Sequence, residues 1–95
     1  MKLIKVAAAA LNQTPLAWDT NQKNILQAIS EARQQDASIL CLPEMCITGY
    51  GCEDAFHSSA VQEEAIRVLL EIAPQTTGMI VSLGLPLPYG GGLFN

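Results

Sequence analysis

LCLPEMCITGYGCED, residues 40–54, is the stretch of sequence that decides how this chain folds. It begins at the end of an apolar run, residues 38–42, which is typical of a buried strand. Pro43 predicts the end of that strand, because proline cannot donate to a sheet and biases the preceding residue toward an extended backbone. Glu44 is therefore expected just past the carboxyl end of a strand, where open α/β sheets form their clefts. A carboxylate there is a candidate general base, and the alternative is a solvated loop residue.

The sequence before this stretch predicts a strand and a helix. Residues 3–11 form a nearly continuous apolar run, which suits a strand that is covered on both faces. Asp19 and Gln22 have the spacing of a capping box at the start of a helix, and this helix is expected to end near residues 35–36. Its apolar stripe is expected to comprise Ile25, Leu26, Ile29 and Ala32, and its polar positions Asn21, Lys23, Asn24, Glu31 and Arg33.

The sequence after the stretch predicts a second helix and two further strands. Ser59 and Gln62 repeat the capping-box spacing, and Pro74 ends the helix. Residues 79–85 are interpreted as a third strand, and residues 93–95 as the start of a fourth. The apolar stripe of this second helix is expected to comprise Val61, Ala65, Val68, Leu69 and Ile72.

A glycine run, residues 90–92, lies between the last two predicted strands. Together with Pro86 and Pro88 it is interpreted as a hairpin turn. A phosphate-binding loop is not favoured, because the run neither follows a G-x-G-x-x-G pattern nor opens a helix. The alternation of strands and helices predicts an α/β fold with βαβ crossovers, and on periodicity alone a flavodoxin-like doubly wound sheet is one form of it.

Composition excludes several classes of protein. A chain of 95 residues has room for one small domain, and its 49% hydrophobic and 15% charged residues exclude a disordered chain. The net charge is −4 and no basic cluster is present, which argues against a nucleic-acid partner. The longest apolar stretch, residues 6–11, is too short to span a bilayer. No signal peptide is recognised at the amino terminus, so a cytoplasmic protein without a membrane partner is expected.

Cys41, Cys46 and Cys52 do not have the spacing of a C-x-x-C motif. Their odd number, without a secretion signal, predicts reduced thiols that pack as small hydrophobic residues. A zinc site completed by His57 is the alternative, but the spacing differs from that of zinc fingers and ribbons, so no metal site is predicted. A nucleophilic role for any of the three lacks a partner residue in this chain.

The pattern P-E-x-x-x-x-G-Y in residues 43–50 resembles the first catalytic block of the nitrilase, or carbon–nitrogen hydrolase, superfamily. The next four residues, GCED, resemble the glutaminase domains of glutamine-dependent NAD synthetases, as do the opening KVAAAALNQTPLAWDTNQKNI and the closing VSLGLPLPYGGGLFN. This resemblance covers nearly the whole chain. It implies that residues 1–95 are the amino-terminal part of a domain with an α-β-β-α sandwich fold, in which two sheets face each other.

The resemblance also implies roles for two residues. Glu44 corresponds to the general base of a Glu–Lys–Cys triad, whose lysine and nucleophilic cysteine are expected beyond Asn95. The segment alone is therefore expected to be inactive. Tyr50 corresponds to a tyrosine that helps to form the glutamine pocket, and the alternative is an aromatic ring that packs beneath the loop.

The function implied by the resemblance is hydrolysis of glutamine to glutamate and ammonia. An ATP-dependent synthetase unit outside this chain would then use the ammonia to convert deamido-NAD to NAD, and ATP and magnesium would belong to that unit. A homo-oligomer is also implied. Two alternatives remain: another amidase or carbamoyl hydrolase of the superfamily, and a non-catalytic scaffold with the same fold.

Overall fold

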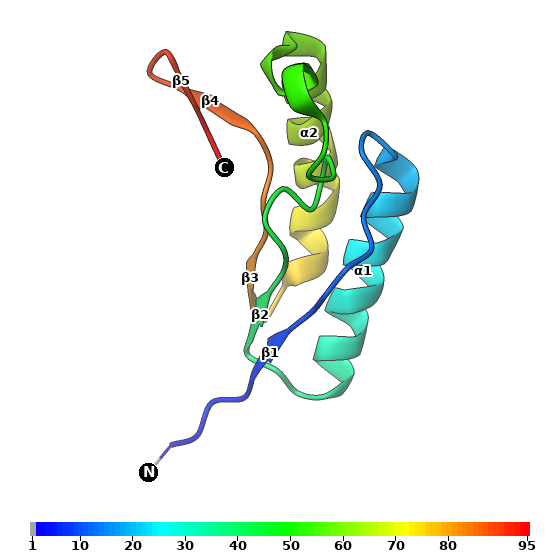
Figure 1. The fold of residues 1–95 in the computed structure, drawn as a ribbon. Coiled ribbons are helices and arrows are strands. Elements are labelled where there is room, and N and C mark those ends of the chain that lie inside the picture. Colours follow the sequence, from blue (N-terminus) through cyan, green and yellow to red (C-terminus); the bar gives the residue numbers. More distant parts are fainter. Residues whose placement is uncertain (1) are drawn as a thin grey trace.

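Three short parallel strands form the sheet of this protein, in a computed structural model that describes residues 2–95 (Figure 1). They are β1 (Val6–Ala8), β2 (Ile39–Cys41) and β3 (Ile80–Ser82), and they lie side by side in the order in which they occur in the sequence. The predicted strands are therefore present, but each is shorter than the apolar run that predicted it.

Two helices, α1 (Trp18–Gln34) and α2 (Ser59–Ile72), connect the strands. Both lie on the same side of the sheet (Figure 1). This arrangement follows from the strand order, because successive crossovers of the same hand between neighbouring parallel strands place their helices on one face. The core between helices and sheet comprises Ile25, Ala28, Ile29, Ala32, Ala37, Leu40, Leu42, Cys46, Ile47, Ala65, Val68, Ile72 and Leu85.

The opposite face of the sheet carries apolar side chains that nothing in residues 2–95 covers. Val6, Ile39 and Ile80 lie next to one another in register across the three strands. Val6 is 66% exposed and Ile80 is 67% exposed. The expectation that the first strand is covered on both faces is therefore not met within this part of the chain.

Both predicted capping boxes are wrong. Helix α1 begins at Trp18 without a side-chain cap, and the amide of Gln22 instead donates to Glu71 on α2, at 2.8 Å. Helix α2 also lacks a side-chain cap, and Gln62 donates to the carbonyl oxygen of Phe56, at 2.9 Å. The two glutamines have the spacing of capping residues, but the tertiary fold offers them other partners.

The last two strands, β4 (Leu87–Tyr89) and β5 (Gly92–Phe94), form an antiparallel hairpin that projects away from the parallel sheet (Figure 1). Gly90 and Gly91, at its tip, have φ angles of 57° and 82°. Two successive residues with positive φ give the turn that matches the twist of a hairpin, so the predicted hairpin turn is confirmed. Strand β4 itself lies in the segment that the sequence assigned to the turn.

Residues 1–95 produced alone are expected to aggregate or to lack a cooperative thermal transition. The reason is the uncovered apolar face of the sheet, whose two outer strands also have unpaired edges. Calorimetry and size-exclusion chromatography of the 95-residue segment check this. A monomer with a sharp, cooperative melt would show instead that the segment is a self-sufficient domain.

Candidate active site

Glu44 lies at the carboxyl end of the parallel sheet. Beyond β2 the hydrogen bonding continues for one residue, as the N–H of Leu42 donates to the carbonyl oxygen of Ser82 at 2.8 Å. Pro43 then ends the ladder, and Glu44 follows with an exposed side chain. The predicted position of Glu44 after a strand is confirmed, and its role as a base stays a prediction.

The turn that follows Glu44 has an unusual backbone. Met45 has a φ of 51°, in the left-handed region that non-glycine residues seldom adopt and that costs about 1–3 kcal/mol. Gly49 closes the turn with φ 83°, and its N–H donates to the carbonyl oxygen of Met45 at 2.9 Å. A Cβ atom at Gly49 would lie 2.8 Å from backbone atoms of Thr14 and Pro15. Only glycine therefore fits between this turn and the segment that leads into α1.

Gly84, two residues after β3, brings a second segment against Glu44. A Cβ atom at Gly84 would overlap the backbone nitrogen of Met45 and would lie 3.0 Å from the carbonyl carbon of Glu44. The carbonyl oxygen of Gly84 accepts a hydrogen bond from the N–H of Ile47, at 3.1 Å. Because Gly84 has no side chain, the peptide between Glu44 and Met45 can lie directly against its backbone.

Asn95, the residue after β5, is a third contact of this turn. Its Oδ1 atom accepts a hydrogen bond from the N–H of Met45, at 3.3 Å. Neither Gly84 nor Asn95 was predicted from the sequence to be part of the site. A signal for Gly84 was present, because an isolated glycine inside a predicted strand often marks a close approach of two backbones. No signal pointed to Asn95.

Tyr50 lies on the same loop and is 69% exposed. The alternative in which its ring packs beneath the loop is therefore not seen. An exposed phenol close in sequence to Glu44 remains compatible with contact to a substrate, and that role stays a prediction.

Two of the three cysteines are buried within the loop that carries Glu44 and Tyr50. Burial raises the pKa of the Cys46 thiol, which favours the neutral form over the nucleophilic thiolate. The thiol of Cys52 donates to the carbonyl oxygens of Thr48 and Gly49, at 3.4 and 3.3 Å. Both thus have the predicted structural role. Cys41, in contrast, is exposed and not packed as predicted.

The alternative of a zinc site depends on His57. His57 is exposed at the end of the 3₁₀ helix η1 (Glu53–His57). Within residues 2–95, no three histidine, cysteine, aspartate or glutamate side chains are grouped as they would be around a metal ion.

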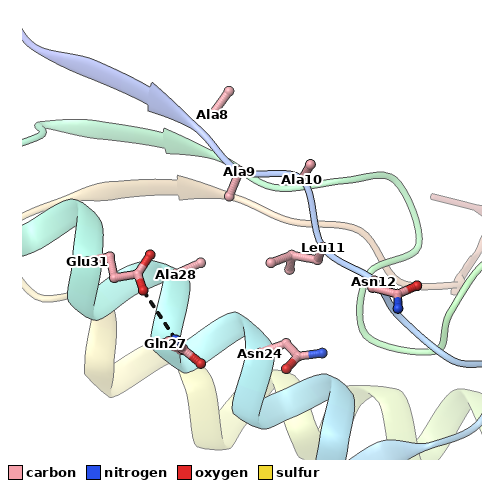
Figure 2. A pocket seen from close by; sticks show the side chains of 9 residues that line it. All are labelled: Ala8, Ala9, Ala10, Leu11, Asn12, Asn24, Gln27, Ala28 and Glu31. Atoms are coloured by element: carbon pink, nitrogen blue, oxygen red, sulfur yellow. Dashed lines mark hydrogen bonds between the residues drawn. The ribbon is translucent and has the colours of Figure 1, made fainter.

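An open groove of about 480 Å³ lies between α1 and the segment that leaves the end of β1 (Figure 2). Its lining comprises Ala8, Ala9, Ala10, Leu11, Asn12, Asn24, Gln27, Ala28 and Glu31. Figure 2 shows three alanines, a leucine and Asn12 on the strand side. On the helix side polar side chains and Ala28 line the groove, and Gln27 donates to Glu31 at 3.2 Å. Neither Glu44 nor Tyr50 lines this groove, so it is separate from the candidate active site.

Comparison with known families identifies the fold to which this site belongs. The carbon-nitrogen hydrolase family matches residues 5–95. The chain belongs to that family. A crystal structure of a glutamine-dependent NAD(+) synthetase from Cytophaga hutchinsonii superimposes with a TM-score of 0.92 and 53% sequence identity, over 97% of this chain and 16% of that one. The predicted nitrilase-type fold, of which this chain contains the first part, is confirmed.

The curated relatives of this member of the carbon-nitrogen hydrolase family are much longer than the chain. It is 34% identical to a glutamine-dependent NAD(+) synthetase from Oryza sativa subsp. indica and 37% identical to one from Arabidopsis thaliana. Both matches cover the whole chain, but the chain spans only about 13% of the length of these relatives. An amidase from Nesterenkonia sp. has a TM-score of 0.79 over 97% of this chain and 41% of its own, and at 19% identity it shows the shared fold alone. No helix within residues 2–95 has the length and hydropathy needed to cross a membrane.

Proposed function

We propose that this chain is part of the glutamine-hydrolysing unit of a glutamine-dependent NAD synthetase. The observation that carries the proposal is the position of Glu44, in the pattern P-E-x-x-x-x-G-Y and at the carboxyl end of a parallel sheet. The 53% identity to a structure of such a synthetase supports this choice within the family.

In this proposal Glu44 acts as the general base for a cysteine nucleophile located outside residues 1–95. The carboxylate takes the thiol proton as sulfur attacks the amide carbon of glutamine, and it returns the proton to the departing ammonia. A lysine, also outside this chain, stabilises the oxyanion. Tyr50, exposed on the loop that begins at Glu44, contacts the substrate amide.

The ammonia then serves an ATP-dependent unit that converts deamido-NAD to NAD. ATP and magnesium are assigned to that unit, which lies outside residues 1–95. A cytoplasmic homo-oligomer completes the proposal, and no nucleic acid or membrane is assigned as a partner.

Isotope transfer tests this function directly. The full-length protein is given glutamine labelled with ¹⁵N at the side-chain amide, together with deamido-NAD, ATP and Mg²⁺. We expect mass spectrometry to find ¹⁵N in the carboxamide of NAD. Hydrolysis of glutamine without labelled NAD would indicate another amidase of the family, and no hydrolysis of any amide would indicate a scaffold.

A further inference from the structure

We propose that Gln13 is a positioning residue for Glu44, and that a cluster of three side-chain amides holds in place the turn that follows Glu44, residues 45–49. The three are Gln13, Asn21 and Asn24, contributed by the segment between β1 and α1 and by the first turns of α1. This inference rests on the proposed function, because it assigns a role to residues that support its catalytic base.

Gln13 links α1 to the turn that follows Glu44. Its Nε2 atom donates to the carbonyl oxygen of Cys46 at 2.7 Å and to the carbonyl oxygen of Asn21 at 3.0 Å. Its Oε1 atom accepts from the side-chain amide of Asn24, at 2.9 Å. A carboxamide has one donor end and one acceptor end, so these three partners fix its orientation. Rotation by half a turn would place oxygen against two carbonyl oxygens.

Asn21 makes the second link. It is fully buried, and its Nδ2 atom donates to the carbonyl oxygens of Thr14 and Ile47, at 2.8 and 3.3 Å. Its Oδ1 atom accepts from the N–H of Thr14, at 3.0 Å. Asn21 was predicted at a polar position of the helix, outside its apolar stripe, but the structure buries it with the core. Its burial is favourable because each of its polar atoms has a partner.

These links hold the backbone at Cys46 and Ile47, two and three residues beyond Glu44. Met45, between Glu44 and the held carbonyls, has the left-handed backbone that must be kept by its surroundings. Without the bond from Gln13, the carbonyl oxygen of Cys46 loses its side-chain donor and the turn can relax toward a more common conformation. The carboxylate of Glu44 would then move away from the position needed for proton transfer.

The test compares two glutamine-to-methionine variants of the full-length protein. Gln13→Met keeps the length of the side chain and removes the amide. Gln22→Met is the matched control, because Gln22 on α1 is similarly half-buried but donates to Glu71 and not to the turn. A glutamine-mimicking electrophile labels the nucleophilic cysteine of each folded active site, and the final extent of labelling gives the fraction of sites that are folded. We then measure kcat and KM for glutamine hydrolysis per labelled site.

For Gln13→Met we expect kcat per labelled site to fall about 10²-fold, with KM changed much less, because a displacement of about 1 Å is enough for such a loss. Gln22→Met is expected to hydrolyse glutamine like the parent protein. A lower final extent of labelling with parental kcat per labelled site would assign Gln13 to stability alone and overturn the proposal. Full labelling together with a parental kcat would also overturn the proposal.

Failure of this inference can be told apart from failure of the proposed function. Glu44→Gln is measured in the same series of variants. If Glu44→Gln loses glutamine hydrolysis while Gln13→Met retains it, the positioning role is wrong and the function stands. If Glu44→Gln itself retains glutamine hydrolysis, the proposed function is wrong.

Discussion

Glu44→Gln in the full-length protein is expected to lower glutamine-driven NAD formation by about 10²–10⁴-fold, which is the usual cost of losing a positioned general base. The substitution keeps the size of the side chain and its hydrogen-bonding capacity but removes its ability to accept a proton. Glu44 is exposed and lies outside the buried core, so its replacement is not expected to affect folding. Steady-state assays with glutamine as the nitrogen source measure the loss.

The same variant should retain most of its activity when ammonium chloride replaces glutamine, because free ammonia reaches the synthetase unit without the glutaminase reaction. Glu63→Gln, at an exposed position on α2, is the matched control and should behave like the parent protein with both nitrogen sources. Equal loss with glutamine and with ammonium would show that Glu44 is structural. Unchanged activity with glutamine would remove Glu44 from the mechanism.

Gly84→Ala is expected to destabilise the glutaminase unit by about 1–3 kcal/mol, the usual cost of forcing an extra methyl group into a packed interior. It should also lower glutamine-driven activity sharply. The added Cβ would overlap the nitrogen of Met45, would lie 2.6 Å from Oδ1 of Asn95 and would lie 3.0 Å from the carbonyl carbon of Glu44. Two of these three contacts are backbone atoms, so the clash is relieved only by moving the turn that carries the base.

Gly51→Ala is the control for the stability effect, because a Cβ there meets only the ring of Pro15, at 3.5 Å, which is an ordinary contact. Thermal unfolding of both variants, followed by calorimetry, compares the two positions. We expect the midpoint to fall for Gly84→Ala and to change little for Gly51→Ala. Equal midpoints, with glutamine hydrolysis unchanged in Gly84→Ala, would contradict the close approach of Gly84, in the segment after β3, to Glu44.

The two long helices and the parallel strands were predictable because each packs one face against the core. The stripe of α2 shows this, since Ala65, Val68 and Ile72 are buried as predicted. The position of Glu44 followed from the local effect of Pro43 on the strand before it. These features depend on residues that are close together in the sequence, so a pattern within the sequence is sufficient to reveal them.

The hydrogen bonds that Asn21 and Asn95 make near Glu44 were not predictable, because they join distant segments. Asn21 is buried since its amide finds a carbonyl oxygen at Ile47, 26 residues away, and no helical periodicity indicates that partner. Asn95 meets Met45 across 50 residues. The failed capping box at Gln22 has the same origin, because Glu71 competes for its amide only once α1 and α2 have packed.

The strand order has a consequence for biosynthesis. Each strand of the parallel sheet pairs with the strand made just before it, so hydrogen bonding of the sheet needs no partner from later in the chain. The entropic cost of closing a connection rises only slowly with its length, so neighbouring strands can pair before later parts of the chain have been synthesised. The apolar face that carries Val6 and Ile80 has no such early partner within these residues. Until later parts of the chain cover this face, the nascent chain exposes a hydrophobic surface of the kind that chaperones bind.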